Sequence, residues 1–225
     1  VAAARAAGAH AQVIDDAAIA AVPHVGLPGA HQRRNAAAAI AAIRALGLAI
    51  VEAALAGVRH PGRFEVIEPG PAGAPRIILD GAHNPHGAAA LADALRERGE
   101  RPVLIIGVSA DKDAAAIAAA LASQWPPAVR AVIATRYQQD RALDPAALAA
   151  AFAPWQASAS LPVTTAPDLR AAIAAAAAHG APIVVAGSLF LVGEARTLLL
   201  GAPTDPMVVT DPPAATPDFM RPSRS

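Results

Sequence analysis

The chain has 225 residues, which is enough for one domain or a domain and a half with a substantial core. Hydrophobic residues make up 55% of the chain but aromatic residues only 3%, so any core must be mostly aliphatic. Eighteen basic residues balance eighteen acidic ones, which argues against nucleic acid or an anionic membrane as the main partner. The absence of cysteine excludes a disulfide scaffold, a thiolate metal site and a cysteine nucleophile.

The length of the apolar runs indicates whether a protein crosses a membrane or carries an export signal. No apolar run approaches the roughly 18 to 20 residues needed to cross a bilayer, and no charged leader precedes an apolar stretch with a cleavage site. We therefore expect a soluble, cytoplasmic protein with no membrane partner. The first residue is Val1 rather than methionine, so we also expect the chain to begin partway through a longer protein.

Two helices are expected before a boundary near residue 58. Apolar and small residues recur at three- and four-residue spacings over 31–46, and Gly47 follows as a stop. A shorter helix is expected over 51–56, closed by Gly57. The dipeptide Pro61-Gly62, preceded by a histidine, then marks a break in the chain.

Beyond this break, strand and helix signals alternate. Apolar runs bounded by turn residues predict six strands, at 63–67, 76–80, 103–107, 129–135, 162–165 and 182–187. Helices are expected between them, at about 87–98, 113–123, 145–152 and 168–178, with a last helix after the sixth strand. Asp144 and Asp168 stand where an acceptor side chain caps a helix, each cap contributing about 1 kcal/mol.

The strand sequences indicate the fold class. The runs 77–79, 103–106 and 183–185 are apolar without alternation, which is typical of strands covered by helices on both faces. We therefore predict an α/β fold, with a Rossmann-like, mostly parallel sheet of about six strands flanked by helices. After residue 202 the sequence offers little to bury, and we expect a disordered tail over 203–225.

Polar residues that directly follow strands are the first candidates for a site, because open α/β sheets bind ligands beyond the carboxyl ends of their strands. Asp80 follows one buried run and precedes His83, Asn84 and His86. A carboxylate there can accept hydrogen bonds from ribose hydroxyls, and an imidazole can contact phosphate or carboxylate oxygens. Two alternatives stay open: Asp80 and Asn84 satisfy loop amides, or Asp80, His83 and His86 bind a metal.

Two further segments have a similar character. Arg63 enters the first strand beside Gly62 and can clamp phosphate oxygens, or else it pairs with Glu65 or Glu68 on the surface. Ser188 follows the sixth strand and can hold an anion together with free backbone N–H groups, or else it only caps the last helix. The chain contains no P-loop, since its only lysine, Lys112, follows an aspartate, and no G-x-S-x-G nucleophile elbow.

Five segments together resemble the folylpolyglutamate synthase and dihydrofolate synthase family, relatives of the Mur ligases. Their order and spacing are those of the family, and Asp80-x-Ala-His-Asn-Pro is the most specific of them. The five segments are Leu27-Pro-Gly-Ala-His-Gln-Arg-Arg-Asn-Ala-Ala37, Pro61-Gly-Arg-Phe-Glu65, Ile78-Leu-Asp-Gly-Ala-His-Asn-Pro-His-Gly87, Gly107 with Asp111-Lys-Asp113, and Ala186-Gly-Ser-Leu-Phe-Leu-Val-Gly193.

This resemblance implies a domain organisation and a set of ligands. Residues 1–57 would be the C-terminal remnant of a P-loop ATPase domain, and 58–202 a C-terminal Rossmann-like ligase domain, with ATP between them. By resemblance, Asn35 contacts adenine or nearby ATP atoms, Arg63 the phosphates and Asp80 the ribose. His83 would lie close to the reacting centre or the incoming glutamate, and Ser188 would also contact the nucleotide. The P-loop and the Mg²⁺ ligands would belong to a part that precedes this chain.

The implied reaction is ATP-dependent ligation of L-glutamate to dihydropteroate or folate through an acyl phosphate. The substrates are then small molecules, nucleic acid is not a partner, and the protein is expected to be a monomer. The chain by itself is expected to be inactive. Two alternatives remain at this stage: a Mur-type ligase for peptidoglycan precursors, and a non-catalytic nucleotide-binding α/β module. Whether the parent enzyme makes dihydrofolate, extends polyglutamate tails or does both lies with pterin-reading residues outside this chain.

Overall fold

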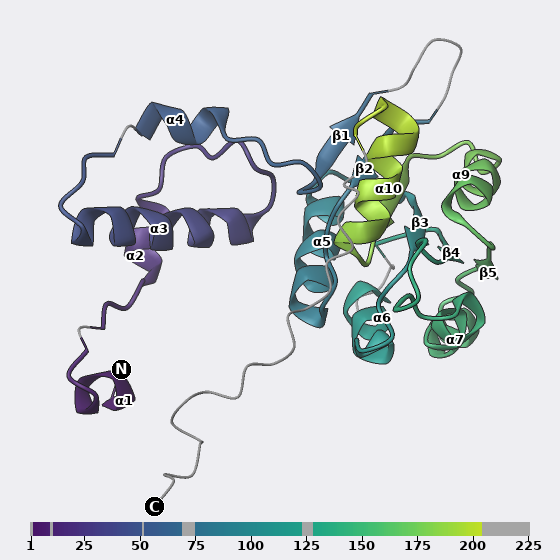
Figure 1. Cartoon of the computed structure of the whole chain (residues 1–225), viewed down its shortest axis with the longest axis horizontal. Helices are drawn as coiled ribbons and strands as arrows, with labels where there is room; N and C mark the ends of the chain where they lie inside the picture. Colours follow the sequence, from purple (N-terminus) through teal and green to yellow (C-terminus); the bar gives the residue numbers. More distant parts are fainter. Residues whose placement is uncertain (1, 10, 51, 69–74, 123–127, 204–225) are drawn as a thin grey trace, which may run out of the picture.

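The computed structural model describes residues 2–9, 11–50, 52–68, 75–122 and 128–203. A group of helices at the N-terminal end lies beside an α/β domain, and the two are joined by the segment around residues 58–62 (Figure 1). The tail expected over 203–225 lies outside the described residues, apart from Pro203. Within those described ranges, no helix has both the length and the apolar composition that crossing a bilayer requires.

The α/β domain is built on a six-stranded, mostly parallel sheet, which confirms the predicted fold class. Its strands occur in the order β1-β2-β6-β3-β4-β5, and all neighbours are parallel except β1 and β2, which are antiparallel. Each strand lies inside one of the six predicted ranges. The strands are β1 (Glu65–Ile67), β2 (Ile77–Leu79), β3 (Val103–Ile106), β4 (Ala131–Ala134), β5 (Val163–Thr165) and β6 (Ile183–Ala186).

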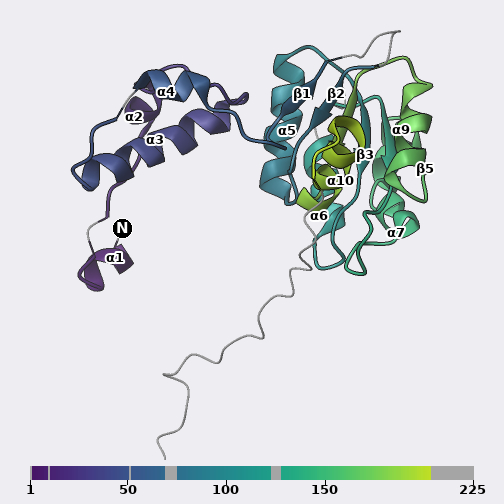
Figure 2. The same cartoon turned by 45° about the horizontal axis from the view of Figure 1, so that its top comes forward.

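Helices cover both faces of this sheet (Figure 2). Alternate residues of one strand enter different cores: Leu104 of β3 packs in the core with α5, α6 and α7, and Ile105 in the core with α9 and α10. Both residues are fully buried, so the continuous apolar runs are explained by burial on both sides. The helices are α5 (Pro85–Glu97), α6 (Ala114–Ala122), α7 (Pro145–Ala150), α8 (Ala153–Ser158), α9 (Leu169–Ala177) and α10 (Leu189–Leu200).

Capping side chains set several helix starts. The Asp144 carboxylate accepts hydrogen bonds from the N–H groups of Ala146 and Ala147, and that of Asp168 from Ala171, as predicted. Helix α5 begins two residues earlier than expected, because Asn84 is its cap and Pro85 occupies the first turn. Helix α8 was not expected, although its own first turn also contains a proline.

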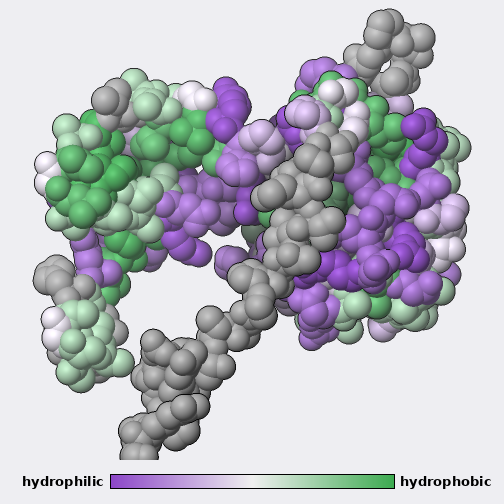
Figure 3. All heavy atoms as spheres, viewed as in Figure 1, coloured by the Kyte–Doolittle hydropathy of each residue, from purple (hydrophilic) through white to green (hydrophobic). Residues whose placement is uncertain are grey.

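The N-terminal helices form a separate, smaller core. They are α1 (Ala2–Ala6), α2 (Asp16–Ala20), α3 (Ala30–Ala45) and α4 (Glu52–Gly57), of which α3 and α4 match the two predicted helices. Val22, Ala36, Ala37 and Ile40 are buried together here. Much of this part's visible surface is apolar, whereas hydrophilic residues gather where it faces the α/β domain (Figure 3).

Candidate functional site

The entrance to β1 lies directly beside the exit from β2. Because these two strands run antiparallel with Glu65 opposite Leu79, the turn that contains Arg63 meets the loop that begins at Asp80. The N–H of Phe64 donates to one Asp80 carboxylate oxygen over 2.9 Å, and the N–H of Gly81 donates to the carbonyl of Gly62 over 2.7 Å. Two of the predicted site residues are thus brought together at one edge of the sheet.

Phe64 adopts a strained backbone conformation in this turn. Its φ is 47°, in the left-handed region that a bulky side chain rarely enters. Such a conformation costs about 1 to 3 kcal/mol and persists only where surrounding contacts determine it. Here the ring is 5% exposed, and the Arg98 guanidinium lies 5.7 Å from its centroid. Burial of the ring therefore holds the backbone next to Arg63 in place.

Burial and hydrogen bonding act in opposite directions on the pKa of the Asp80 carboxyl group. Burial raises its pKa, while the N–H groups of Phe64 and Ala82, which donate to its two oxygens over 2.9 Å each, act in the opposite direction. The positive charge of Arg63 also favours the ionised form. Each oxygen retains a second lone pair, so Asp80 satisfies loop amides and still has acceptor capacity for a ligand hydroxyl. The two interpretations of this residue are therefore compatible.

Arg63 itself is exposed, and nothing in the described part of the chain forms a hydrogen bond or ion pair with its guanidinium. The surface pairing considered from sequence is not found, because Glu65 pairs with Arg196 of α10 instead. A guanidinium has five N–H donors in a rigid fork, which matches phosphate or carboxylate oxygens. Arg63 therefore has its full donor set available to an anionic ligand.

His83 and Ser188 lie on two loops that touch. The N–H of Gly187, which precedes Ser188, donates to the carbonyl of Ala82 over 2.8 Å. His83 Nδ1 lies 2.7 Å from the carbonyl of Gly81; since a carbonyl only accepts, Nδ1 carries the proton and Nε2 is free. Ser188 Oγ accepts a hydrogen bond from the N–H of Phe190, so this hydroxyl caps α10, as its structural interpretation predicted.

Asn84 caps α5, since its side-chain oxygen accepts a hydrogen bond from the N–H of Gly87 over 2.8 Å. The metal interpretation of Asp80, His83 and His86 finds no support. Across the described ranges, no group of three or more histidine, aspartate or glutamate side chains is arranged to hold a metal ion.

His31 was not singled out from sequence, yet it lies close enough to Asp80 for the two side chains to affect each other's charge. It lies near the start of α3, and burial lowers its pKa while the nearby Asp80 carboxylate opposes this shift. Arg63 and His86 are also close enough to act on it. Its position four residues before Asn35 was the available signal, because residues at this spacing share one face of a helix.

Asn35 lies on α3, apart from the strand-end loops that carry the other predicted site residues. It is exposed on α3, and its side chain donates to Gln32 of the same helix over 3.2 Å. Within the described residues, no hydrogen bond joins it to Arg63 or Asp80. It does share the helix face of His31, which lies close enough to Asp80 to be affected by its charge.

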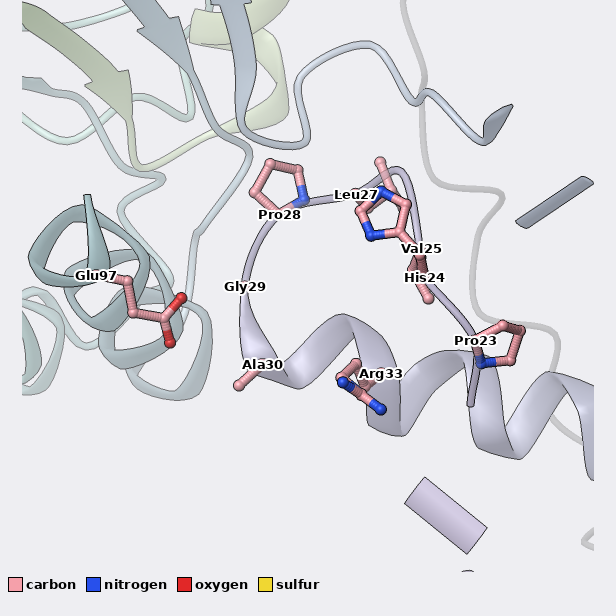
Figure 4. A pocket seen from close by; sticks show the side chains of 9 residues that line it. All are labelled: Pro23, His24, Val25, Leu27, Pro28, Gly29, Ala30, Arg33 and Glu97. Atoms are coloured by element: carbon pink, nitrogen blue, oxygen red, sulfur yellow. The ribbon is translucent and has the colours of Figure 1, made fainter. Parts of the chain in front are cut away.

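A separate hollow of about 300 Å³ lies where the segment before α3 meets α5. Pro28, Ala30 and Arg33 line it from one side, and the Glu97 side chain extends toward it from α5 (Figure 4). None of the five predicted site residues is among its lining residues. The Arg33 guanidinium already donates hydrogen bonds to the carbonyls of Ala20 and Val22. This hollow therefore belongs to the junction of the two parts and not to the Arg63–Asp80 edge.

Comparison with known proteins places this edge in context. Residues 62–189 match the family described as Mur ligase, glutamate ligase domain. The chain is 39% identical over 178 residues to a probable bifunctional folylpolyglutamate synthase/dihydropteroate synthase of Halobacterium salinarum, covering 77% of this chain and 21% of that protein. It is 34% identical over 206 residues to the dihydrofolate synthase/folylpolyglutamate synthase of Mycobacterium tuberculosis, covering 78% of this chain and 39% of the relative.

Solved structures agree with these sequence matches. Mycobacterium tuberculosis folylpolyglutamate synthase complexed with ADP and AMPPCP superimposes with a TM-score of 0.69 at 34% identity, covering 81% of this chain and 42% of that one. The Thermotoga maritima folylpolyglutamate synthase gives a TM-score of 0.62 at 32% identity, covering 80% of this chain and 41% of that one. The chain thus spans about a fifth to two fifths of the length of these relatives.

Proposed function

Since the chain belongs to the Mur ligase family, with the glutamate ligase domain over residues 62–189, we propose that it is part of an ATP-dependent ligase that joins L-glutamate to dihydropteroate or folate. The folylpolyglutamate and dihydrofolate synthases among its relatives support this substrate class. The observation that carries the proposal is that Arg63, whose guanidinium has no partner among the described residues, lies near the Asp80 carboxylate at one sheet edge.

The residues of this edge suit a nucleotide. The free lone pairs of Asp80 accept hydrogen bonds from the ribose hydroxyls, and the fork of Arg63 binds phosphate oxygens. Asn35 approaches the adenine from α3, and the Ser188 loop contributes its N–H groups beside the Asp80 loop. That a related mycobacterial synthase has been solved with ADP supports this assignment. The Mg²⁺ ligands and the P-loop are assigned to a part of the enzyme outside residues 1–225.

The proposed reaction has two steps. A carboxylate oxygen of the pteroate or folate attacks the γ-phosphorus of ATP, and ADP leaves. The amine of L-glutamate then attacks the acyl carbon, loses a proton, and displaces phosphate to form the amide. Arg63 offsets charge on the phosphate oxygens, and we assign His83, whose Nε2 is free, to the reacting centre or the incoming glutamate. The contribution of these residues is mainly positioning and charge stabilisation.

The proposed domain organisation follows the same reasoning. Residues 1–57, with their own small core, would be the end of the ATPase domain, and 58–202 the Rossmann-like ligase domain. Because the catalytic cleft needs both domains complete, we predict that the 225-residue chain alone does not ligate glutamate. Purified chain that turned over would contradict this division. Monomeric state and a cytoplasmic location remain predictions.

The test uses the full-length enzyme that contains this chain, with radiolabelled glutamate as the substrate. Incorporation should require ATP and either dihydropteroate or folate, whereas a UDP-sugar peptide should not serve as acceptor. Arg63→Ala should remove about 1.5 to 3 kcal/mol of charged hydrogen bonding, and so lower kcat/KM about ten- to over a hundredfold.

The matched control is Arg130→Ala, because Arg130 is also exposed but precedes β4, on the far side of the sheet from β1. This variant should retain normal kinetics. Unchanged kinetics in Arg63→Ala would remove Arg63 from the site. Incorporation into the UDP-sugar peptide, but not into the pteroate or folate, would replace the proposed substrate class by that of the peptidoglycan ligases.

A further inference from the structure

Glu65 and Arg196 form an ion pair that connects the first strand of the sheet to its last helix. The Arg196 guanidinium donates to one oxygen of the Glu65 carboxylate. The other oxygen accepts the N–H of Gly62 over 2.8 Å. The two side chains are only 22% and 25% exposed, so solvent screens this pair less than it screens a surface pair. One carboxylate therefore joins α10 to the turn that precedes β1.

Gly62 is held on its other sides as well. Its carbonyl accepts the N–H of Gly81 over 2.7 Å. A side chain at Gly62 would meet Val192 of α10, because a Cβ placed there lies 2.7 Å from Val192 Cγ1. Val192 and Arg196 are one helical turn apart, so both face the same turn from α10. The residue before Arg63 is thus clamped between α10 and the Asp80 loop.

The residue after Arg63 is equally constrained. The N–H of Phe64 donates to Asp80, and its ring is buried. Arg63 is therefore an exposed side chain on a backbone that is anchored at both neighbours. Binding an anion with a flexible side chain costs conformational entropy, and part of that cost disappears when the backbone is already fixed.

On this basis we propose that the Glu65–Arg196 ion pair is a positioning element, which holds the 62–64 turn so that the Arg63 guanidinium faces the nucleotide phosphates. The inference rests on the proposed function, because it assigns Arg63 an anionic ligand. Glu65 and Arg196 do not contact the nucleotide themselves. Their effect on binding passes entirely through Arg63.

The experiment measures ADP binding to the full-length enzyme by isothermal titration calorimetry, together with the KM for ATP. Glu65→Ala should weaken ADP binding by about three- to tenfold, since coupled charge pairs typically act on this scale. In an Arg63→Ala background, the same substitution should weaken it no further. Glu68→Ala is the matched control, because this glutamate lies just beyond β1, is exposed, and should leave binding unchanged.

Two more variants separate positioning from folding. Glu65→Gln keeps an acceptor for the N–H of Gly62 but loses the charge, so it tests the ion pair in a protein that keeps the turn hydrogen bond. Arg196→Lys retains a cation and should keep binding within about twofold, whereas Arg196→Met should match Glu65→Gln. Thermal unfolding of each variant checks that losses of affinity do not follow losses of stability.

Each outcome decides between explanations. Equal weakening by Glu65→Ala with and without Arg63 would overturn the inference, because the pair would then act on the fold in general. Weakening by Arg63→Ala but not by Glu65→Ala or Glu65→Gln would overturn only this inference and leave the proposed function standing. ADP binding that is indifferent to Arg63→Ala would instead contradict the role of Arg63 in the proposed site.

Discussion

Gly187, at the end of β6, is a position where alanine should be strongly destabilising. Its φ is 103°, which L-residues with a side chain rarely adopt. A Cβ there would lie 2.6 Å from the carbonyl oxygen of Gly107 and 2.9 Å from Ile106 Cγ1. This carbonyl belongs to the residue directly after β3, and β3 is the direct neighbour of β6 in the middle of the sheet. Relief of this contact would require the two central strands to separate.

The expected magnitude combines two terms. Left-handed backbone strain in a residue with a Cβ costs about 1 to 2 kcal/mol. Overpacking against a rigid neighbour typically costs about 1 to 3 kcal/mol. Gly187→Ala should therefore lower the free energy of unfolding by about 2 to 5 kcal/mol. For a protein of this size that corresponds to a fall in Tm of about 4 to 20 °C.

Two other glycines provide matched controls in urea and thermal unfolding. Gly180 has a φ of 58°, but a Cβ at this position would meet nothing within 4 Å, so its alanine variant should show the strain cost alone. Gly193 lies exposed inside α10 with open space around it, and alanine there should stabilise the protein by about 0.5 to 1 kcal/mol. A loss at Gly187 no larger than that at Gly180 would refute the close-approach reasoning.

Three further outcomes are expected. The folded pKa of Asp80 is raised above its ordinary value of about 3.9, so the native state binds more protons than the unfolded chain in this pH range. The contribution of Asp80 to stability should therefore fall as pH rises through the folded pKa. If the difference in unfolding free energy between the unsubstituted protein and Asp80→Asn did not change across this range, the prediction would be wrong. Asp168→Ala should cost about 1 kcal/mol through loss of the α9 cap, measured by urea unfolding against Arg170→Ala as the control. Tyr137→Phe should cost about 1 to 2 kcal/mol in the same assay. The buried Ser109 hydroxyl lies 2.6 Å from the Tyr137 hydroxyl and would lose this hydrogen-bond partner. An unchanged unfolding midpoint would show that Ser109 finds another hydrogen-bond partner.

Most of the α/β fold could be predicted because its signals are local. A strand such as β3 is apolar throughout, since both its faces are buried, and this is visible within four residues. The caps at Asp144 and Asp168 act on N–H groups two or three residues away. Helix α8 escaped prediction because its few residues have no clear apolar period, and only its packing beside Phe152 and Leu161 marks its place.

In the candidate site too, local features could be predicted from the sequence and long-range features could not. The sequence by itself proposed Arg63, Asp80, His83 and Ser188 as candidates, because each lies next to a strand in a recognisable segment. Only the tertiary structure decided that Glu65 pairs with Arg196, 131 residues away, and so leaves Arg63 free. It also decided that β1 runs antiparallel to β2, which places Arg63 beside Asp80. Strand direction and long-range charge pairing depend on how distant elements pack, and no short stretch of residues encodes either one.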